Sequence, residues 1–180
     1  GGGWGWDVVI EALVAYEPGV KYESGWRRSR WYELLGQDYV ALAFQYAHEA
    51  DPDALLFYND YETHTPAKRA LILGLVRSLQ KKGIAIHGIG HQAHYSVDGP
   101  AAAELEATIQ ALAAAGLRNH VTELDLSLRP RMDADVPALT EALKARQAAR
   151  WAEFFRMFRR NRRKIDAVLT WGVNVQDSWL

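Results

Sequence analysis

The sequence predicts an α/β fold built on a parallel β-sheet, and two observations predict it. First, strand-like apolar runs alternate with helix-like amphipathic runs through five strands, with no second composition regime. This alternation is typical of parallel strands joined by right-handed crossovers. Second, acidic and amide side chains stand where several of these strands end, and functional groups gather at that edge in such sheets. We expect one domain over residues 4–180, after a linker or cloning remnant at residues 1–3.

Composition and charge exclude several classes of protein. Lys plus Arg number 21 and Asp plus Glu number 22, so no global field attracts nucleic acid or an anionic membrane. Cysteine is absent, which excludes disulfides and thiol chemistry. No apolar run approaches the roughly 20 residues that span a bilayer, and no signal peptide opens the chain. The 180 residues suffice for a real core, but a complete eight-stranded α/β barrel needs about 250.

Individual elements follow from periodicity and from their end signals. Apolar residues at three-and-four spacing predict the helices. Pro52 ends the first of them, because the residue before a proline avoids helical angles. Thr65 and Pro66 are the N-cap and first residue of the second helix. The predicted elements are a strand over 6–11, a helix over 37–49, a strand over 54–58, a helix from Thr65 to Gly83, a strand over 84–89, a helix over 101–115, a strand over 121–126, a helix over 139–158 and a strand over 167–173.

The strand over 121–126 carries two carboxylates. Period-two alternation places Glu123 and Asp125 on one face and the leucines between them on the other. Two acids in a sealed core would cost several kcal/mol each, so they must face a partner, a metal or a water-lined cleft. A structural ion pair is one reading. The strand over 6–11, which also ends in a glutamate, Glu11, favours the other: paired-carboxylate chemistry.

Other sites are weaker. His87, His91 and His94 suggest a metal site, but the last two have opposite strand parity, so a regular strand cannot bring all three together. We therefore expect neither a metal nor a cofactor. The basic run Arg159–Lys164 ends the long helix, where cations complement the helix dipole and are usually solvated, so we expect no nucleic-acid partner. His94 and Gln92 could be satisfied core groups, and Tyr58 is expected in the core.

Taken together, the motifs resemble those of family 10 glycoside hydrolases, the endo-β-1,4-xylanases, over residues 6–180. The resemblance implies a partial (β/α)8 TIM barrel that covers strands four to eight with their helices. It also implies secretion and, as substrate, xylan or a xylo-oligosaccharide. The motifs are Trp6-Asp7-Val8-Val9-x-Glu11-Ala12, Tyr58-Asn59-Asp60-Tyr61, Gly88-Ile89-Gly90-x-Gln92-x-His94, Thr122-Glu123-Leu124-Asp125 and Trp171-Gly172-Val173 with Ser178-Trp179.

The resemblance also implies roles for single residues. It makes Glu123 the nucleophile and Glu11 the general acid, which becomes the base in the second step of a retaining mechanism. His94 and Asp125 would hold the nucleophile, and Gln92 would line the subsite of the covalent sugar. The expected substrate-binding residues are Trp171 and Trp179, which would stack on sugars, Tyr61 on the leaving-group side, and Asn59 and Asp60 at the same strand end.

Three departures from the family pattern bear on activity. Ile10 stands where the family has an asparagine that grips the sugar 2-hydroxyl, so we expect a large loss of rate. Glu62 and Asn174 stand where the family usually has Asn and Asp. The units matching the first three strands are absent, so we expect the arc to need a complementing amino-terminal half or a second copy. The alternative is a weak or inactive barrel fragment that binds carbohydrate or serves as an assembly scaffold.

Overall fold

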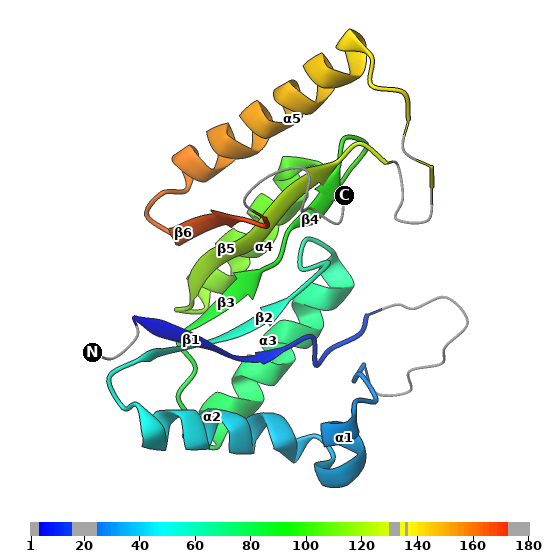
Figure 1. Ribbon diagram of the computed structural model, residues 1–180. Helices are drawn as coiled ribbons and strands as arrows, with labels where there is room; N and C mark the ends of the chain where they lie inside the picture. Colours follow the sequence, from blue (N-terminus) through cyan, green and yellow to red (C-terminus); the bar gives the residue numbers. More distant parts are fainter. Residues whose placement is uncertain (1–3, 16–24, 130–133, 136, 173–180) are drawn as a thin grey trace.

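A computed structural model of the protein describes residues 4–15, 25–129, 134–135 and 137–172, and every structural statement below concerns these residues. Within them lies a single sheet whose strand pairs are all parallel, as predicted (Figure 1). The strands are β1 (Gly5–Ile10), β2 (Leu55–Asp60), β3 (Gly88–His91), β4 (His94–Ser96), β5 (Arg118–Ser127) and β6 (Ile165–Thr170). The helices are α1 (Arg30–Leu35), α2 (Asp38–Ala50), α3 (Pro66–Lys81), α4 (Ala102–Ala114) and α5 (Glu141–Arg160).

The strands follow one another across the sheet in chain order. β1 pairs with β2, β2 with β3, and β5 with β6 on its far side. β3 pairs with the first part of β5, and β4 pairs with its last part, so β3 and β4 are two pieces of one interrupted strand. Because every strand runs the same way, Glu11, Asp60, His94 and Trp171 all lie at or just after the carboxyl-terminal ends of β1, β2, β3 and β6, along the same edge of the sheet.

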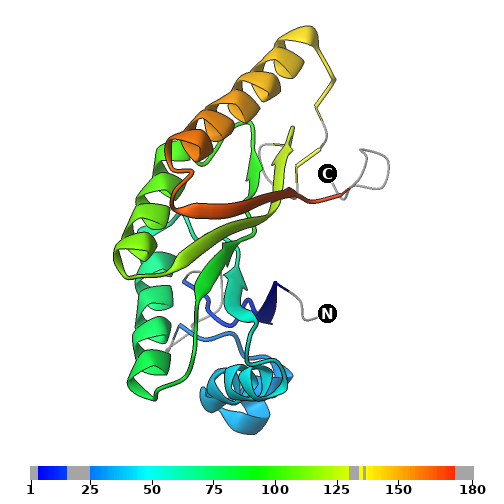
Figure 2. The same cartoon turned by 90° about the vertical axis from the view of Figure 1, so that its left-hand side faces the viewer.

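Helices cover one face of the sheet, and among the described residues no helix lies on the opposite face (Figure 2). The core lies between the sheet and the helices in two clusters. One joins β1, β2 and β3 to α2 and α3, and its fully buried members include Phe44, Leu56 and Ile72. The other joins β5 to α4 and α5, and includes Leu124 and Phe154. The predicted cap of α3 is confirmed, since the Thr65 hydroxyl accepts from the Lys68 N–H at 3.2 Å and Pro66 is the first helical residue.

Several predicted boundaries were wrong. The strand predicted over 84–89 begins only at Gly88. In the register that pairs Phe57 with Gly88, residues 84 and 85 lie opposite positions that precede the start of β2 at Leu55, and the Leu56 N–H donates to the His87 ring at 2.9 Å. Helix α1 was missed because it is short and buries no residue. The interruption between β3 and β4 was also missed. The predicted strand over 167–173 lies two residues earlier, as β6, and Val173 falls outside the described residues.

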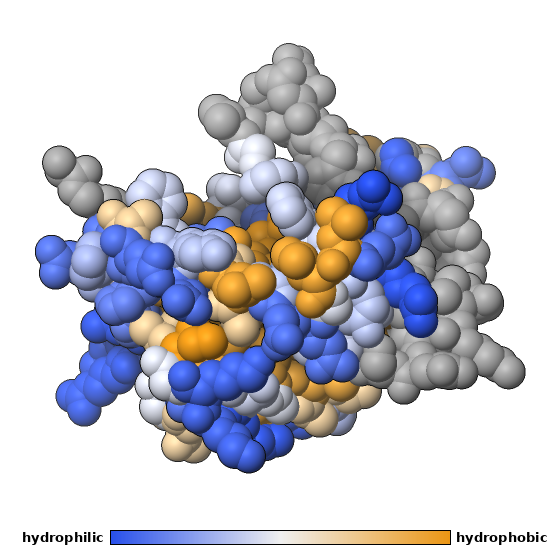
Figure 3. Space-filling view, turned by 90° about the horizontal axis from the view of Figure 1, so that it is seen from below, coloured by the Kyte–Doolittle hydropathy of each residue, from blue (hydrophilic) through white to orange (hydrophobic). Residues whose placement is uncertain are grey.

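β1 is an edge strand with a large apolar surface beside it. A groove of about 640 Å³ runs between β1 and helices α1 and α2, and its walls include Ile10, Trp31, Leu35 and Tyr46. Figure 3 shows hydrophobic residues gathered at the centre of the face seen from below, the side on which α1 and α2 lie in Figure 1. Among the described residues, no helix has the length and hydropathy needed to cross a membrane.

Candidate active site

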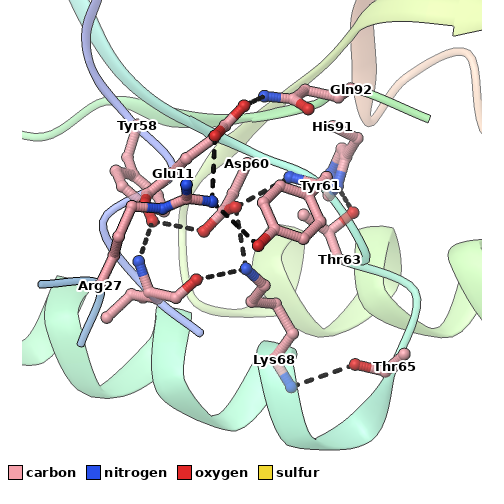
Figure 4. Close-up of polar contacts among 11 residues, drawn as sticks. Glu11, Arg27, Tyr58, Asp60, Tyr61, Thr63, Thr65, Lys68, His91 and Gln92 are labelled. Carbon is pink, nitrogen blue, oxygen red and sulfur yellow. Dashed lines mark hydrogen bonds and ion pairs between the residues drawn. The ribbon is translucent and has the colours of Figure 1, made fainter. Parts of the chain in front are cut away.

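Glu11 lies directly after β1 in a left-handed turn, with φ at 54°. This backbone region is uncommon for residues other than glycine and persists only where the surroundings hold it. The Glu11 N–H donates to the Asn59 carbonyl at 2.9 Å, and its own carbonyl accepts from Arg27 Nε at 2.8 Å. Its carboxylate is half-buried between Gln92 Nε2, at 3.1 Å from Oε1, and Arg27 Nη2, at 3.1 Å from Oε2 (Figure 4).

Glu123 and Asp125 both contact His94, as alternation along β5 requires if they share a face. His94 Nε2 lies 3.1 Å from Glu123 Oε2, and His94 Nδ1 lies 2.9 Å from Asp125 Oδ2. Burial lowers the pKa of His94, but the hydrogen bonds and charges of Asp125 and Glu123 outweigh it, so that the pKa is raised overall. The two carboxylates favour the charged form of the imidazole between them, and this interaction helps to accommodate them in a partly buried strand.

The segment 92–94 connects the two glutamates. Gln92 binds Glu11, and His94, two residues later, binds Glu123. Ala93 between them adopts a left-handed conformation with φ at 60°, which is the interruption between β3 and β4. Glu11 and Glu123, more than a hundred residues apart in the chain, are thus both bound by one short segment at the junction of β3 and β4.

Asn59 is almost fully buried beneath Glu123. Its Nδ2 donates to Glu123 Oε1 at 3.2 Å, and its Oδ1 accepts from the Thr122 hydroxyl at 3.0 Å. A Cβ at Gly90 would lie 2.7 Å from Asn59 Oδ1, so the glycine leaves the room that the Asn59 amide occupies. With only 3% of Asn59 exposed, the side chain acts in this structure as a support for Glu123.

Asp60 has no exposed surface, which corrects its expected place among the residues that touch substrate. Its carboxylate accepts from Lys68 Nζ at 2.9 Å, from the Tyr61 N–H at 2.9 Å and from the Tyr58 hydroxyl (Figure 4). Burial raises the pKa of Asp60, and the cation of Lys68 opposes that rise. Tyr58 is buried, as predicted, and its hydroxyl also accepts from the Leu13 N–H at 3.0 Å.

The aromatic residues at this edge are placed differently. The Tyr61 hydroxyl accepts from Arg27 Nη2 at 3.0 Å, which sets Tyr61 close to Glu11. Trp171 is 52% exposed, and its ring meets the His94 ring edge-on, with centroids 6.2 Å apart. Trp171 thus borders the Glu123 side of the edge, with ring surface left for a ligand. Trp179 and Asn174 lie outside the described residues. Glu62 is exposed and, like Glu11, left-handed, with φ at 53°.

The three histidines that suggested a metal have separate partners. His87 Nδ1 accepts from the Leu56 N–H at 2.9 Å, whereas His91 is hydrogen-bonded to Thr63 at 2.7 Å and Asn119 at 3.0 Å. Burial lowers the pKa of His91 to about 4, so its ring is neutral at pH 7. Within the described ranges, no three acidic or histidine side chains are grouped as a metal site would require.

Sequence reasoning missed Arg27 and Lys68. Arg27 lies in an irregular segment with no periodicity to mark it, as one arginine in the run Trp26-Arg27-Arg28. Lys68 is in the first turn of α3, where a lysine would normally be solvated, yet its side chain is fully buried. No signal in the sequence distinguishes either residue from its exposed neighbours, because the partners that fix them are distant in the chain.

Comparisons with known proteins agree on one family. The family model described as glycosyl hydrolase family 10 matches residues 3–180. Two similar relatives are an endo-1,4-beta-xylanase of Geobacillus stearothermophilus, 44% identical over 97% of this chain and 52% of the relative, and endo-1,4-beta-xylanase B of Paenibacillus barcinonensis, 42% identical over 98% and 52%. The crystal structure of xylanase XynB from Paenibacillus barcinonensis superposes with a TM-score of 0.88 and 42% identity, covering 98% of this chain and 52% of that one. The chain spans about half the length of these relatives.

Proposed function

Because the chain belongs to glycosyl hydrolase family 10 and forms the carboxyl-terminal half of its TIM barrel, we propose that it carries the catalytic carboxylates of a retaining endo-β-1,4-xylanase. The observation that carries the proposal is the bridge from Glu11 to Glu123 through Gln92 and His94. Retaining glycosidases need two carboxyl groups about 5 to 5.5 Å apart on either side of one glycosidic bond. Two glutamates bound by residues only two positions apart suit that requirement.

In the first step Glu123 attacks the anomeric carbon of a xylose unit while Glu11 gives its proton to the departing glycosidic oxygen. The bond to the leaving sugar breaks as the glycosyl–enzyme ester forms. The His94 pair with Asp125 orients Glu123, and the Asn59 amide holds its other oxygen. Each oxygen of Glu123 thus has a fixed partner, so the carboxylate is held in a preorganised position before the sugar binds.

In the second step Glu11, now ionised, takes a proton from water, and the water oxygen attacks the same carbon. The ester bond breaks, Glu123 is released as a carboxylate and the sugar keeps its original configuration. Gln92 and Arg27 each bind one oxygen of Glu11, so the same group can be aimed in both steps. Trp171 supplies an exposed ring beside His94 on which a sugar can stack.

The test is xylan hydrolysis by the chain and by its Glu123→Ala variant, assayed alone and mixed with the amino-terminal half of a family relative. We expect activity in the unsubstituted protein and a loss of at least about 10³-fold in the variant, since removal of a nucleophile leaves little of the mechanism. Glu49→Gln, an exposed change on α2, is the matched control and should leave the rate unchanged. Activity that survives Glu123→Ala would contradict the proposed mechanism.

We also propose that a second polypeptide segment completes the barrel, either an amino-terminal half or a second copy. In the described part of the chain no strand pairs with the outer edge of β1, the groove beside it is apolar, and Trp6, Trp31 and Tyr46 are all more than half exposed. Such an edge and patch favour association. Mass measurement in solution tests this, because a cooperatively folded monomer of 20.3 kDa would contradict it.

A second candidate function has one specific observation in its favour. Ile10, directly before Glu11, cannot donate a hydrogen bond, and its side chain lines the apolar groove at 55% exposure. A fragment that binds carbohydrate or serves as an assembly scaffold would tolerate this residue. Absence of xylan hydrolysis both in the unsubstituted chain and in Glu123→Ala, with either mixing partner, would favour this candidate.

A further inference from the structure

We propose that Arg27 is a positioning residue that fixes Glu11 both through its main chain and through its carboxylate. The inference rests on the proposed acid–base role of Glu11. Arg27 is not adjacent to any of the sequence motifs, and it reaches Glu11 from the irregular segment 25–29. Its contacts with the turn, with the carboxylate and with Tyr61 together support the assignment.

The main-chain contacts hold the left-handed turn. Arg27 Nε donates to the Glu11 carbonyl at 2.8 Å, and the Arg27 N–H donates to the Ala12 carbonyl at 2.8 Å. Leu13 and Trp26 then form an antiparallel bridge, so the two segments are joined at three successive residues. An unusual φ costs roughly 1–3 kcal/mol and is kept only where neighbours over-determine it. Arg27 supplies two of the hydrogen bonds that do so.

The side-chain contacts aim the carboxylate. Arg27 Nη2 lies 3.1 Å from Glu11 Oε2 and donates to the Tyr61 hydroxyl at 3.0 Å, while Gln92 holds the other Glu11 oxygen. The planar guanidinium makes these contacts at once, because Nε binds the Glu11 carbonyl while Nη2 binds both the Glu11 carboxylate and the Tyr61 phenol (Figure 4). A lysine, with a single ammonium, could not reproduce that fork.

Tyr61, the phenol that Arg27 contacts, packs against the buried Lys68. The Tyr61 ring lies over Lys68 Nζ at 4.2 Å from its centroid, and Lys68 is buried against Asp60. Lys68 also donates to the Leu13 carbonyl, at the far end of the same turn. Through Tyr61, Arg27 therefore connects the half-exposed Glu11 to the buried Lys68–Asp60 pair. A general acid that must be held in one position needs such rigid support.

The consequence is a dependence on the leaving group. A poor leaving group needs the proton from Glu11 when the glycosidic bond breaks, whereas a dinitrophenolate leaves without it. The measurement is kcat/KM, which reports the first step, for dinitrophenyl xylobioside and for methyl xylobioside, with the chain and the amino-terminal half of a relative. In Arg27→Gln we expect a loss of about tenfold or more on the methyl substrate and less than about threefold on the dinitrophenyl one.

Two controls separate this inference from the proposed function. Arg30→Gln removes a nearby arginine, whose 3.7 Å pair with Glu33 is exposed, and should change neither substrate. Glu11→Ala should show the same leaving-group dependence more strongly. If Glu11→Ala shows none, the proposed acid is wrong. If Glu11→Ala shows it and Arg27→Gln does not, or lowers both substrates equally, only the role of Arg27 is overturned.

A structural readout makes the test independent of activity. In crystals of Arg27→Gln, we expect the Glu11 carboxylate to lose its contact with Gln92 and Glu11 to leave the left-handed region. Arg27→Lys, which keeps the charge but not the fork, should show the same loss in part. A Glu11 that keeps its φ and its bond to Gln92 in the Arg27→Gln crystal would overturn the inference.

Discussion

Glu123 and Glu11 are supported by opposite kinds of surroundings. Glu123 lies within β5, which has a paired strand on each side, and its contacts come from His94 on β4 and Asn59 on β2. Glu11 lies after β1, a strand with a free edge, and half of its support comes from Arg27 in an irregular segment. The sheet interior thus provides the proposed nucleophile with regular geometry, whereas the proposed acid depends on side chains that replace a missing neighbour.

Ile10, the departure from the family pattern next to the proposed acid, is on the β1 side, in the wall of the apolar groove. The residues that contact Glu123 lie instead within the motifs that carry the family resemblance. A residue on an edge strand is constrained by fewer neighbours, so its identity can change with less effect on folding. The β1 side is therefore where activity can be lost while the fold is kept.

The largest expected effect concerns the buried Lys68–Asp60 ion pair, which supports the β1 side. Lys68→Met should lower the free energy of unfolding by about 3–5 kcal/mol, because it leaves the fully buried Asp60 without its cation. Urea unfolding followed by circular dichroism measures it, with midpoint and slope both fitted. If the β1 side were loosely held, as its free edge suggests, the loss would be below about 1 kcal/mol.

A matched pair of variants separates the buried charge from the loss of a side chain. Lys82→Met removes an exposed lysine whose 2.8 Å pair with Asp38 is solvated, and should cost less than about 1 kcal/mol. Adding Asp60→Asn to Lys68→Met removes the uncompensated charge and should recover part of the stability. If Asp60→Asn recovers none of the lost stability, then Lys68 stabilises the fold through its packing and not through its charge.

The sequence predicted the β5 side of this comparison better than the β1 side. Alternation in residues 121–126 predicted that Glu123 and Asp125 share a face, and the common partner His94 confirms it. This succeeds because strand periodicity follows from backbone geometry alone. The sequence did not predict that Asp60 is buried, because that depends on Lys68 in α3 and Tyr58 two residues before it.

Irregular backbone was equally hidden from the sequence. The left-handed conformation of Glu11 places its carboxylate against Gln92, and that of Ala93 separates β3 from β4 just before His94. Neither glutamate nor alanine favours this backbone region. The strand predicted over 84–89 gives no sign of the second piece, β4, or of the left-handed residue before it. The elements could be predicted from local pattern, but the turns that aim the side chains could not.

Ile10 allows a test of the β1 side alone. Ile10→Asn should raise kcat/KM on xylo-oligosaccharides by about ten- to hundredfold, because an amide before the acid can hydrogen-bond the sugar hydroxyl as the transition state forms. The substitution is at an exposed position, so little change in stability is expected. Ile10→Leu, which matches asparagine in shape without its amide, is the control and should not raise the rate. A rate unchanged in Ile10→Asn would contradict the expectation that Ile10 lowers the rate.

The smallest expected effect tests the β5 side through pH. The pKa of His94 is lowered by burial and raised, on balance, by Asp125 and Glu123. A histidine whose folded-state pKa exceeds its unfolded value of about 6.5 stabilises the fold fully below pH 6.5 and loses that contribution as pH rises through the folded-state pKa. Asp125→Asn should therefore be less stable than the unsubstituted chain by about 1–2 kcal/mol at pH 5.5. That difference should shrink towards pH 9, as measured by urea unfolding at each pH.

Asp166→Asn, whose 3.4 Å pair with Arg118 is largely exposed, should show no such trend. A difference for Asp125→Asn that stays constant from pH 5.5 to about 9 would mean that His94 is not charged between the two acids.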